Sequence, residues 1–201
     1  MFLKSQPALI LASTSVYRRT LLERLGVPFS THSPGIEETP RAGESPQALV
    51  ARLAHAKAAA IAGRHPDAWV IGSDQTAVLA AAAGESRMVG KPGTVDACIR
   101  QLREASGRTL SFLTAVAVLR EGGGAHEFID TTRVRFRTLD QATIERYVES
   151  ESPLDCAGGF KSEGLGIALC ELIESADPTA LIGLPLIRLA HVLRQIGFPI
   201  P

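Results

Sequence analysis

Short apolar runs alternate with amphipathic segments along most of this chain. The run at 8–12 predicts a buried strand, and leucines at helical spacing over 16–25 predict a helix that ends at Gly26. The same patterns predict strands at 27–33, 69–73, 76–79, 110–119, 126–136 and 167–173, and helices at 46–62, 94–105, 140–149 and 185–195. Because strands and helices are mixed, the predicted class is α/β with a partly antiparallel sheet.

Local breaks between these elements carry their own signals. Ser45 followed by Pro46 is a typical helix start, with serine as the cap and proline in the first turn. The glycines at 122–124 predict a hairpin turn between two strands. A small-residue segment at 80–88 predicts a hairpin tip, and the glycine-punctuated segment at 158–166 predicts a loop.

Composition narrows the classes of protein. A length of 201 residues suits one large domain or two closely joined lobes, and 45% apolar residues argue against disorder. Lys plus Arg and Asp plus Glu both number 21, which disfavours binding along a nucleic-acid backbone. The three cysteines lack metal-ligand spacing and favour a reducing cytoplasm. No apolar run suits a signal peptide or a membrane span.

The segment ASTSVYRR places hydroxyls and arginines where a strand gives way to a helix. Helix starts attract phosphate through free N–H groups, and Ser13, Arg18 and Arg19 could add contacts to it. The alternative is that Ser15 simply caps the helix while both arginines are solvated.

Carboxylates occur at two further places. Glu38 follows Glu37 in a polar loop and could bind a hard cation, or the loop could simply be solvated. Asp74 follows the apolar strand at 69–73 and a glycine, where it could bind a metal, activate water, or serve only as a turn residue.

Three other charged residues do not indicate a functional role by themselves. Lys57 lies in an alanine-rich helix and by itself predicts a solvated side chain. Lys91 precedes a proline that could aim it at a phosphate. Glu163 lies among glycines that allow a backbone to approach a ligand closely, although an exposed loop explains the pattern as well.

Taken together, the ordered segments resemble the Maf family of nucleotide pyrophosphatases, from Leu9 to about Arg194. The segments that carry the resemblance are LASTSVYRR, EETP, RLAHAKA, IGSDQ, GKP, CAGGFKSEG and LIGLPL. The resemblance implies a Maf/ITPase-like fold with an extended mixed sheet flanked by helices. It also implies that residues 1–201 form a single catalytic domain, with two lobes around a deep central cleft, and a homodimer.

The resemblance also assigns roles to individual residues. Asp74 matches the family's proton acceptor, and Glu38 with Asp74 matches the acidic pair near a divalent metal cation, Mg or Mn. The phosphate-contacting set is matched by Ser13, Arg18, Arg19, Lys57 and Lys91.

Three positions indicate a branch of the family. Most members with dTTP and UTP activity have S-P-R-R, G-A-D-T and A-Y-G-I-Q-G, whereas this chain has Tyr17, Gln75 and Glu163 at these places. The set is similar to the branch that hydrolyses 7-methyl-GTP. Methylation at N7 makes guanine cationic, so an aromatic face at Tyr17 and a carboxylate at Glu163 suit it.

The expected function is hydrolysis of the α–β phosphate bond of 7-methyl-GTP, giving 7-methyl-GMP and pyrophosphate, in the house-cleaning of modified nucleotides. The alternatives are a dTTP/UTP pyrophosphatase of the same family and a non-hydrolysing nucleotide-binding regulator of cell division. In each case the partner is a small-molecule nucleotide, with no nucleic acid and no membrane.

Overall fold

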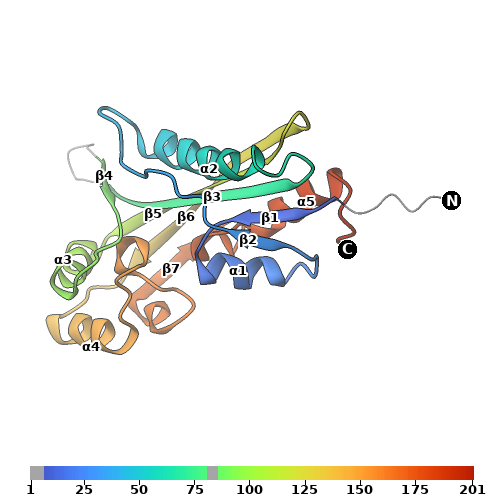
Figure 1. The fold of residues 1–201 in the computed structure, drawn as a ribbon. Helices are drawn as coiled ribbons and strands as arrows, with labels where there is room; N and C mark the ends of the chain where they lie inside the picture. The colour runs from blue at the N-terminus through green and yellow to red at the C-terminus, as the bar shows by residue number, and fades with distance from the viewer. Residues whose placement is uncertain (1–6, 81–85) are drawn as a thin grey trace. The chain divides into compact units, whose positions relative to one another are not determined.

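Strands and helices alternate along the computed structural model, which describes residues 7–80 and 86–201 (Figure 1). The strands are β1 (Leu9–Ala12), β2 (Ser30–His32), β3 (Trp69–Ala80), β4 (Ser86–Val89), β5 (Thr109–Arg120), β6 (Gly124–Phe136) and β7 (Cys170–Glu174). The α-helices are α1 (Val16–Glu23), α2 (Pro46–Ala62), α3 (Val95–Ala105), α4 (Gln141–Glu151) and α5 (Leu186–Gln195). Short 3-10 helices form at η1 (Ala157–Gly159), η2 (Leu165–Leu169) and η3 (Ala180–Ile182).

The strands are hydrogen bonded into one sheet in the order β2-β1-β3-β5-β6-β7, with β4 pairing to β3. Strand β1 runs parallel to both β2 and β3, whereas β3–β4 and β6–β7 are antiparallel. The predicted α/β class with a mixed sheet is therefore confirmed.

Several predicted boundaries were wrong. Asp74 does not end its strand, because β3 continues through it to Ala80. The strand predicted at 27–33 is shortened to β2, since Pro28 has no N–H to donate to a neighbouring strand. The first part of the strand predicted at 167–173 forms η2 instead. The hairpin tip predicted at 80–88 falls largely on 81–85, outside the described residues.

The chain divides into two compact units, and each unit is built from more than one segment of the sequence. The first unit runs to Asp74 and also includes Thr114–Asp130 and Asp177–Pro201. The second comprises Gln75–Leu113 and Thr131–Ala176. The single catalytic domain with a cleft between two lobes stays a prediction.

In the first unit, alternate strand residues face opposite sides of the sheet. Leu9 and Leu11 of β1 and Ile71 of β3 join one buried apolar cluster with leucines of α1 and α5. Helix α2 covers the opposite face of these strands (Figure 1). Its buried side chains are Leu49, Val50, Leu53, Ala54, Lys57, Ala58, Ile61 and Ala62, so a lysine lies on its core-facing side.

The second unit has an aromatic centre. Phe160 is buried, with its ring centroid 5.1 Å from that of Phe136 and 5.9 Å from that of Phe112. Phe160 belongs to the glycine-rich segment that follows η1, so this ring anchors the segment to strands β5 and β6.

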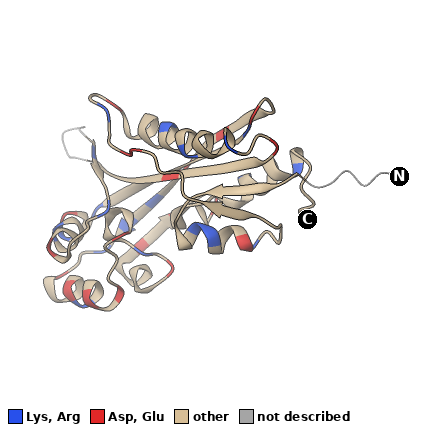
Figure 2. Ribbon diagram, in the orientation of Figure 1, with Lys and Arg blue, Asp and Glu red and all other residues tan. Residues whose placement is uncertain are grey.

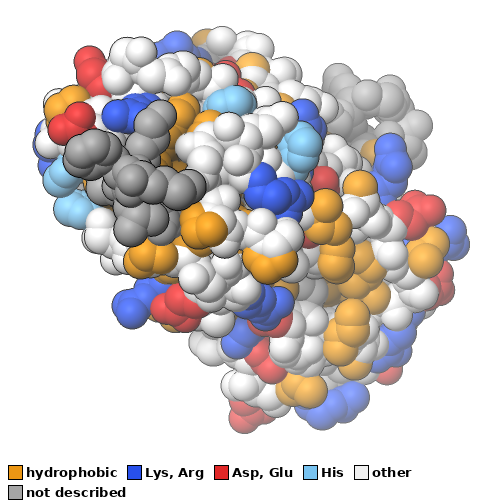
Figure 3. Space-filling model, turned by 90° about the vertical axis from the view of Figure 1, so that its right-hand side faces the viewer, with side chains coloured by type: hydrophobic (Ala, Val, Ile, Leu, Met, Phe, Trp, Pro, Cys, Tyr) orange, Lys and Arg blue, Asp and Glu red, His pale blue; other side chains and the backbone are white. Residues whose placement is uncertain are grey.

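Charged side chains of both signs are interspersed along the ribbon (Figure 2). On the face shown in Figure 3 they are mixed with hydrophobic ones rather than gathered into a basic surface. Within 7–80 and 86–201, none of the helices combines the length and the hydropathy that a bilayer crossing requires.

Helix α2 approaches strand β3 very closely at Gly72. A Cβ atom at this position would lie 2.2 Å from the carbonyl oxygen of Ala54 and 2.7 Å from the backbone nitrogen of Ala58. Both of those atoms belong to the helix backbone, so a rotamer change cannot relieve the overlap. Only glycine permits this spacing between helix and strand.

We therefore expect Gly72→Ala to lower the free energy of unfolding by about 1–3 kcal/mol, because the helix must shift to admit a methyl group. Urea unfolding followed by circular dichroism measures this as a lower midpoint. Gly63→Ala, at the end of the same helix, is the control. Its Cβ would lie 3.8 Å from the nearest atom, at an ordinary φ of −61°, and should change stability by less than about 1 kcal/mol. Equal effects of the two substitutions would contradict the close-approach argument.

Candidate active site

A buried lysine lies between two carboxylates in the first unit. The Nζ of Lys57 donates to Oδ1 of Asp74 at 2.6 Å and lies 2.9 Å from Oε1 of Glu38. Lys57 is 5% exposed and Asp74 7%, while the Glu38 side chain is half exposed. Helix α2, strand β3 and the loop before α2 thus bring one cation and two anions together.

Burial governs the charge on Asp74. It raises the pKa of the carboxyl above its usual value, and the charge and hydrogen bond of Lys57 oppose that rise, followed by the charge of Arg18. The pair with Lys57 thus limits a rise in the pKa of Asp74 that burial causes and that the charge of Glu38 adds to.

Arg18 is the second cation of this group. Its Nε donates to the carbonyl oxygen of Gly183 at 3.0 Å. Burial lowers the pKa of Arg18, and the charges of Asp74 and Glu38 counteract that shift. The first unit therefore joins Arg18, Lys57, Asp74 and Glu38 in one electrostatic cluster.

The start of α1 combines a cap with a polar turn. The hydroxyl of Ser15 accepts from the backbone N–H of Arg18 at 3.4 Å, and the hydroxyl of buried Ser13 accepts from the N–H of Ser15 at 3.1 Å. Arg19 differs from its neighbour, since its side chain is 62% exposed and pairs with Glu23 one turn along the helix. The phosphate role of Ser13 and Arg19 stays a prediction, and Tyr17 is partly exposed nearby in the same turn.

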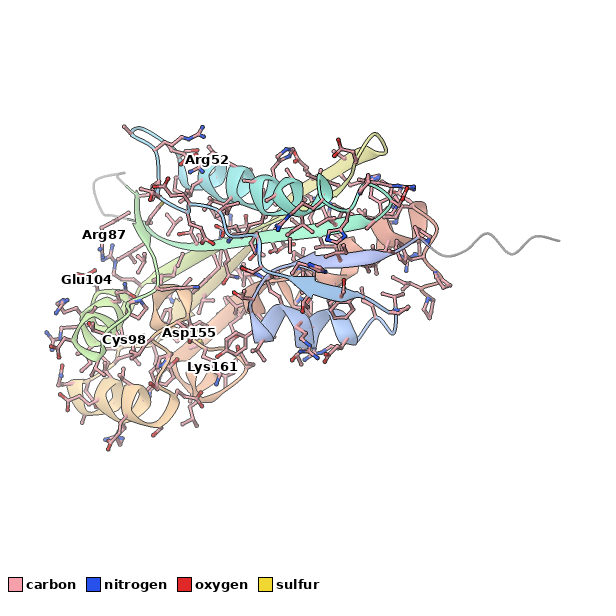
Figure 4. The ribbon with its side chains drawn as sticks, viewed as in Figure 1. Arg52, Arg87, Cys98, Glu104, Asp155 and Lys161 are labelled. Atoms are coloured by element: carbon pink, nitrogen blue, oxygen red, sulfur yellow. The ribbon has the colours of Figure 1, made fainter. Side chains whose placement is uncertain are left out.

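The loop that carries Glu38 is fastened to α2. Arg52 donates to both carboxylate oxygens of Glu44, from Nε at 2.6 Å and from Nη2 at 2.7 Å, and also to the carbonyl of Thr39 at 3.2 Å (Figure 4). Glu44 also accepts from the backbone N–H of Arg41 at 3.0 Å. These contacts hold the segment after Glu38 against the helix that carries Lys57.

The carboxylates of Glu38 and Asp74 suit a divalent metal. Both already approach one cation, and magnesium is usually held by one or two carboxylates together with substrate phosphates and water. No cluster of three or more His, Cys, Asp or Glu with metal-binding geometry occurs among the described residues. The donor set therefore fits a metal that the substrate helps to hold.

In the second unit, the Gly90-Lys91-Pro92 segment is tied to the glycine-rich loop. The N–H of Gly158 donates to the carbonyl of Gly90 at 3.1 Å, and the N–H of Gly93 donates to that of Leu154 at 3.0 Å. Lys91, between these bonds, is exposed. The unit therefore brings the segments that carry Lys91 and Glu163 together.

Helix α4 braces the loop that carries Glu163. The Tyr147 hydroxyl accepts from the backbone N–H of Lys161 at 2.9 Å. Glu151 accepts from the N–H of Leu165 at 2.9 Å and pairs with the Lys161 ammonium at 3.2 Å (Figure 4). Glu163 itself is exposed, which leaves its carboxylate accessible at the tip of a supported loop.

Sequence reasoning alone favoured a solvated Lys57 and gave no role to the residues that hold Arg18. The structure buries Lys57 and shows that Arg18 and Ser73 both donate to the carbonyl oxygen of Gly183, a contact that the sequence does not predict. The segment LIGLPL, which contains Gly183, carries a signal only as part of the family resemblance. Gln75 lies in the second unit, and its part in specificity stays a prediction.

Comparisons with known proteins agree with the resemblance. A family model described as "Maf-like protein" matches residues 8–196. A protein of Xanthomonas axonopodis pv. citri (strain 306) named "7-methyl-GTP pyrophosphatase" is 54% identical over 195 residues, covering 97% of this chain and all of that protein. A protein of Pseudomonas aeruginosa PAO1 with the same name is 51% identical over 196 residues, with 97% and 100% coverage.

A solved structure that matches nearly the whole chain shares the fold. It is titled "Structure of a HAM1 protein from Coxiella burnetii", with a TM-score of 0.54 and 16% identity, and the match covers 94% of this chain and 100% of the other. At that identity the likeness bears on the fold alone, and it supports the expected mixed α/β architecture.

The fastening of the Glu38 loop can be tested by Arg52→Lys. Lysine cannot form the forked bond to Glu44, so the backbone N–H of Arg41 should exchange with solvent about tenfold faster. Hydrogen exchange of residues 37–44 measures this. Arg64→Lys, just after the end of α2, is the control, because the bond that the structure gives to the Arg64 side chain goes to the carbonyl of Ala60 in that helix and not to the loop. Unchanged exchange in Arg52→Lys would show that the fork does not hold the loop.

Proposed function

Since this chain belongs to the family of Maf-like proteins, we propose that it hydrolyses the α–β phosphate bond of 7-methyl-GTP to give 7-methyl-GMP and pyrophosphate. One observation carries this proposal. About half of all positions, across nearly the whole chain, are identical to those of curated proteins named 7-methyl-GTP pyrophosphatase. The cluster of Arg18, Lys57, Asp74 and Glu38 supplies chemistry that fits it.

The reaction needs a nucleophile and positive charge around the phosphates. Asp74 is the proposed general base, which takes a proton from the water whose oxygen attacks the α-phosphorus. The bond between that phosphorus and the bridging oxygen breaks, and pyrophosphate leaves with the electron pair. Arg18 and Lys57 stabilise the charge that develops on the phosphate oxygens. Lys91 of the second unit is proposed as a further phosphate contact.

We propose a divalent cation, Mg or Mn, held by Glu38 and Asp74. Bound there, it would neutralise charge on the triphosphate and polarise a phosphoryl oxygen. Lys57 contacts one oxygen of each carboxylate, so it keeps the two close together without an added ion.

Base selection is proposed to rest on Glu163, Tyr17 and Gln75. An exposed carboxylate complements the delocalised positive charge of N7-methylguanine and accepts from its N1 and N2 donors. An aromatic ring adds a stacking face for the same cation. Tyr147 and Glu151 hold the Glu163 loop through hydrogen bonds to its backbone. This supports the role, because a side chain that selects the base must be held in place.

We further propose a homodimer in the cytoplasm. Leu165 and Ile167 of η2 and Leu172 of the edge strand β7 are each more than half exposed, which suits contact with a second copy. Three free cysteines fit a reducing compartment.

Asp74→Asn should lower kcat for 7-methyl-GTP by about 10²–10⁴-fold, because the amide cannot accept the water proton. Pyrophosphate release by the purified protein is the measurement, with thermal melting to confirm folding. Asp67→Asn is the matched control on an exposed residue before β3 and should retain full activity. Undiminished turnover in Asp74→Asn would remove Asp74 from the mechanism.

Glu163→Gln should raise KM for 7-methyl-GTP by about tenfold while leaving rates on dTTP and UTP unchanged, since the lost charge faces the methylated base alone. Steady-state kinetics on the three nucleotides measure the ratio. Glu149→Gln on the exposed side of α4 serves as the charge-matched control. An equal loss on all three nucleotides would refute base selection by Glu163, and faster wild-type turnover of dTTP or UTP would assign the chain to that activity.

A further inference from the structure

The carbonyl oxygen of Gly183 is shared by two side chains of the first unit. Arg18 donates to it from Nε at 3.0 Å, and Ser73 donates from Oγ at 2.9 Å. A carbonyl oxygen has two lone pairs, so these two bonds use its full accepting capacity. Ser73 is completely buried on β3, directly before Asp74.

We propose that Ser73 and the segment 177–187 are positioning elements that fix the guanidinium of Arg18 for the triphosphate. The inference rests on the proposed function and deepens it, because it assigns a role to residues that do not touch the substrate. Its physical basis is that planar, forked recognition of phosphate by arginine requires a fixed guanidinium plane.

The segment that offers the carbonyl is internally braced. The buried carboxylate of Asp177 accepts from the backbone N–H and the hydroxyl of Thr179, at 2.9 and 2.6 Å, and from the N–H of Ile187 at 2.6 Å. The Thr179 hydroxyl also accepts from the N–H of Leu186 at 2.8 Å. These bonds close the segment onto the start of α5, so the loop cannot shift without breaking several of them.

A strand fastens the same segment from the sheet side. Buried Thr114 of β5 donates its hydroxyl to the carbonyl of Ala180 at 2.9 Å, three residues before Gly183. Gly183 has a φ of +117°, and a Cβ there would lie 3.2 Å from Nε of Arg18. Glycine therefore allows both the backbone turn and the close approach of the arginine.

The bond at Nε leaves the two terminal nitrogens of Arg18, with four N–H donors, for other partners. Ser73 donates to the same carbonyl from the residue before the proposed base, so one oxygen ties the position of the arginine to β3. Without that hydroxyl, the carbonyl of Gly183 loses its own bond to β3, and the segment keeps the bond from Thr114 to Ala180 three residues away. Arg18 then gains freedom of orientation.

The test is a double-mutant cycle of Ser73→Ala with Arg18→Lys, since lysine has no Nε–H to be positioned. Ser73→Ala should lower kcat/KM for 7-methyl-GTP by about tenfold in the wild-type background and by less than about twofold in the Arg18→Lys background. Ser73→Cys keeps a weak donor of similar volume and should lie between serine and alanine. Ser175→Ala, which removes a hydroxyl bonded to Thr132 in the second unit, is the control and should leave kcat/KM unchanged.

The same four proteins of the cycle are titrated with inorganic tripolyphosphate by calorimetry, which needs no turnover. Ser73→Ala should weaken binding about fivefold to tenfold only where Arg18 is present. No effect, or an equal loss in both backgrounds, overturns the inference and makes Ser73 a merely structural residue. Coupled binding in a wild-type protein that releases no pyrophosphate would instead overturn the proposed function and retain the positioning role.

Discussion

The ion pair between Lys57 and Asp74 is the constraint on which the site depends. Leaving an ammonium buried and unpaired costs on the order of several kcal/mol, so a lysine on the core face of α2 requires anionic partners. Asp74 and Glu38 supply them from a strand and a loop that are distant in sequence. Folding the first unit therefore already assembles charges of both signs at one place.

Each member of that cluster has its own structural support. Gly72 lets α2 approach β3 closely enough for the pair to form, Arg52 fastens the loop that carries Glu38, and Gly183 receives Arg18. Each of these supports is a close backbone contact or a hydrogen bond whose donor and acceptor both belong to the folded protein. Such arrangements give a polar site a defined geometry before any ligand arrives.

The pattern of apolar and polar positions was enough to predict the class and most elements, because short apolar runs, amphipathic segments and caps such as Ser45-Pro46 are local signals. It predicted strands on both sides of Asp74 but not that β3 passes through this residue without a break, since small and polar residues lack a strand-like signal there. Lys57 could not be assigned from its helix alone, because its burial depends on carboxylates outside the helix. The role of Gly183 could not be predicted either, because its backbone carbonyl is the acceptor and every residue has such a carbonyl.

The division of the chain has a consequence for its modularity. The polypeptide passes from one unit to the other at four points, after Asp74, Leu113, Asp130 and Ala176, three of them inside strands β3, β5 and β6. Neither unit is a continuous stretch of polypeptide, so no cut at a single peptide bond separates one unit from the other. Exchange of one terminal segment between related chains therefore cannot replace one unit and leave the other whole.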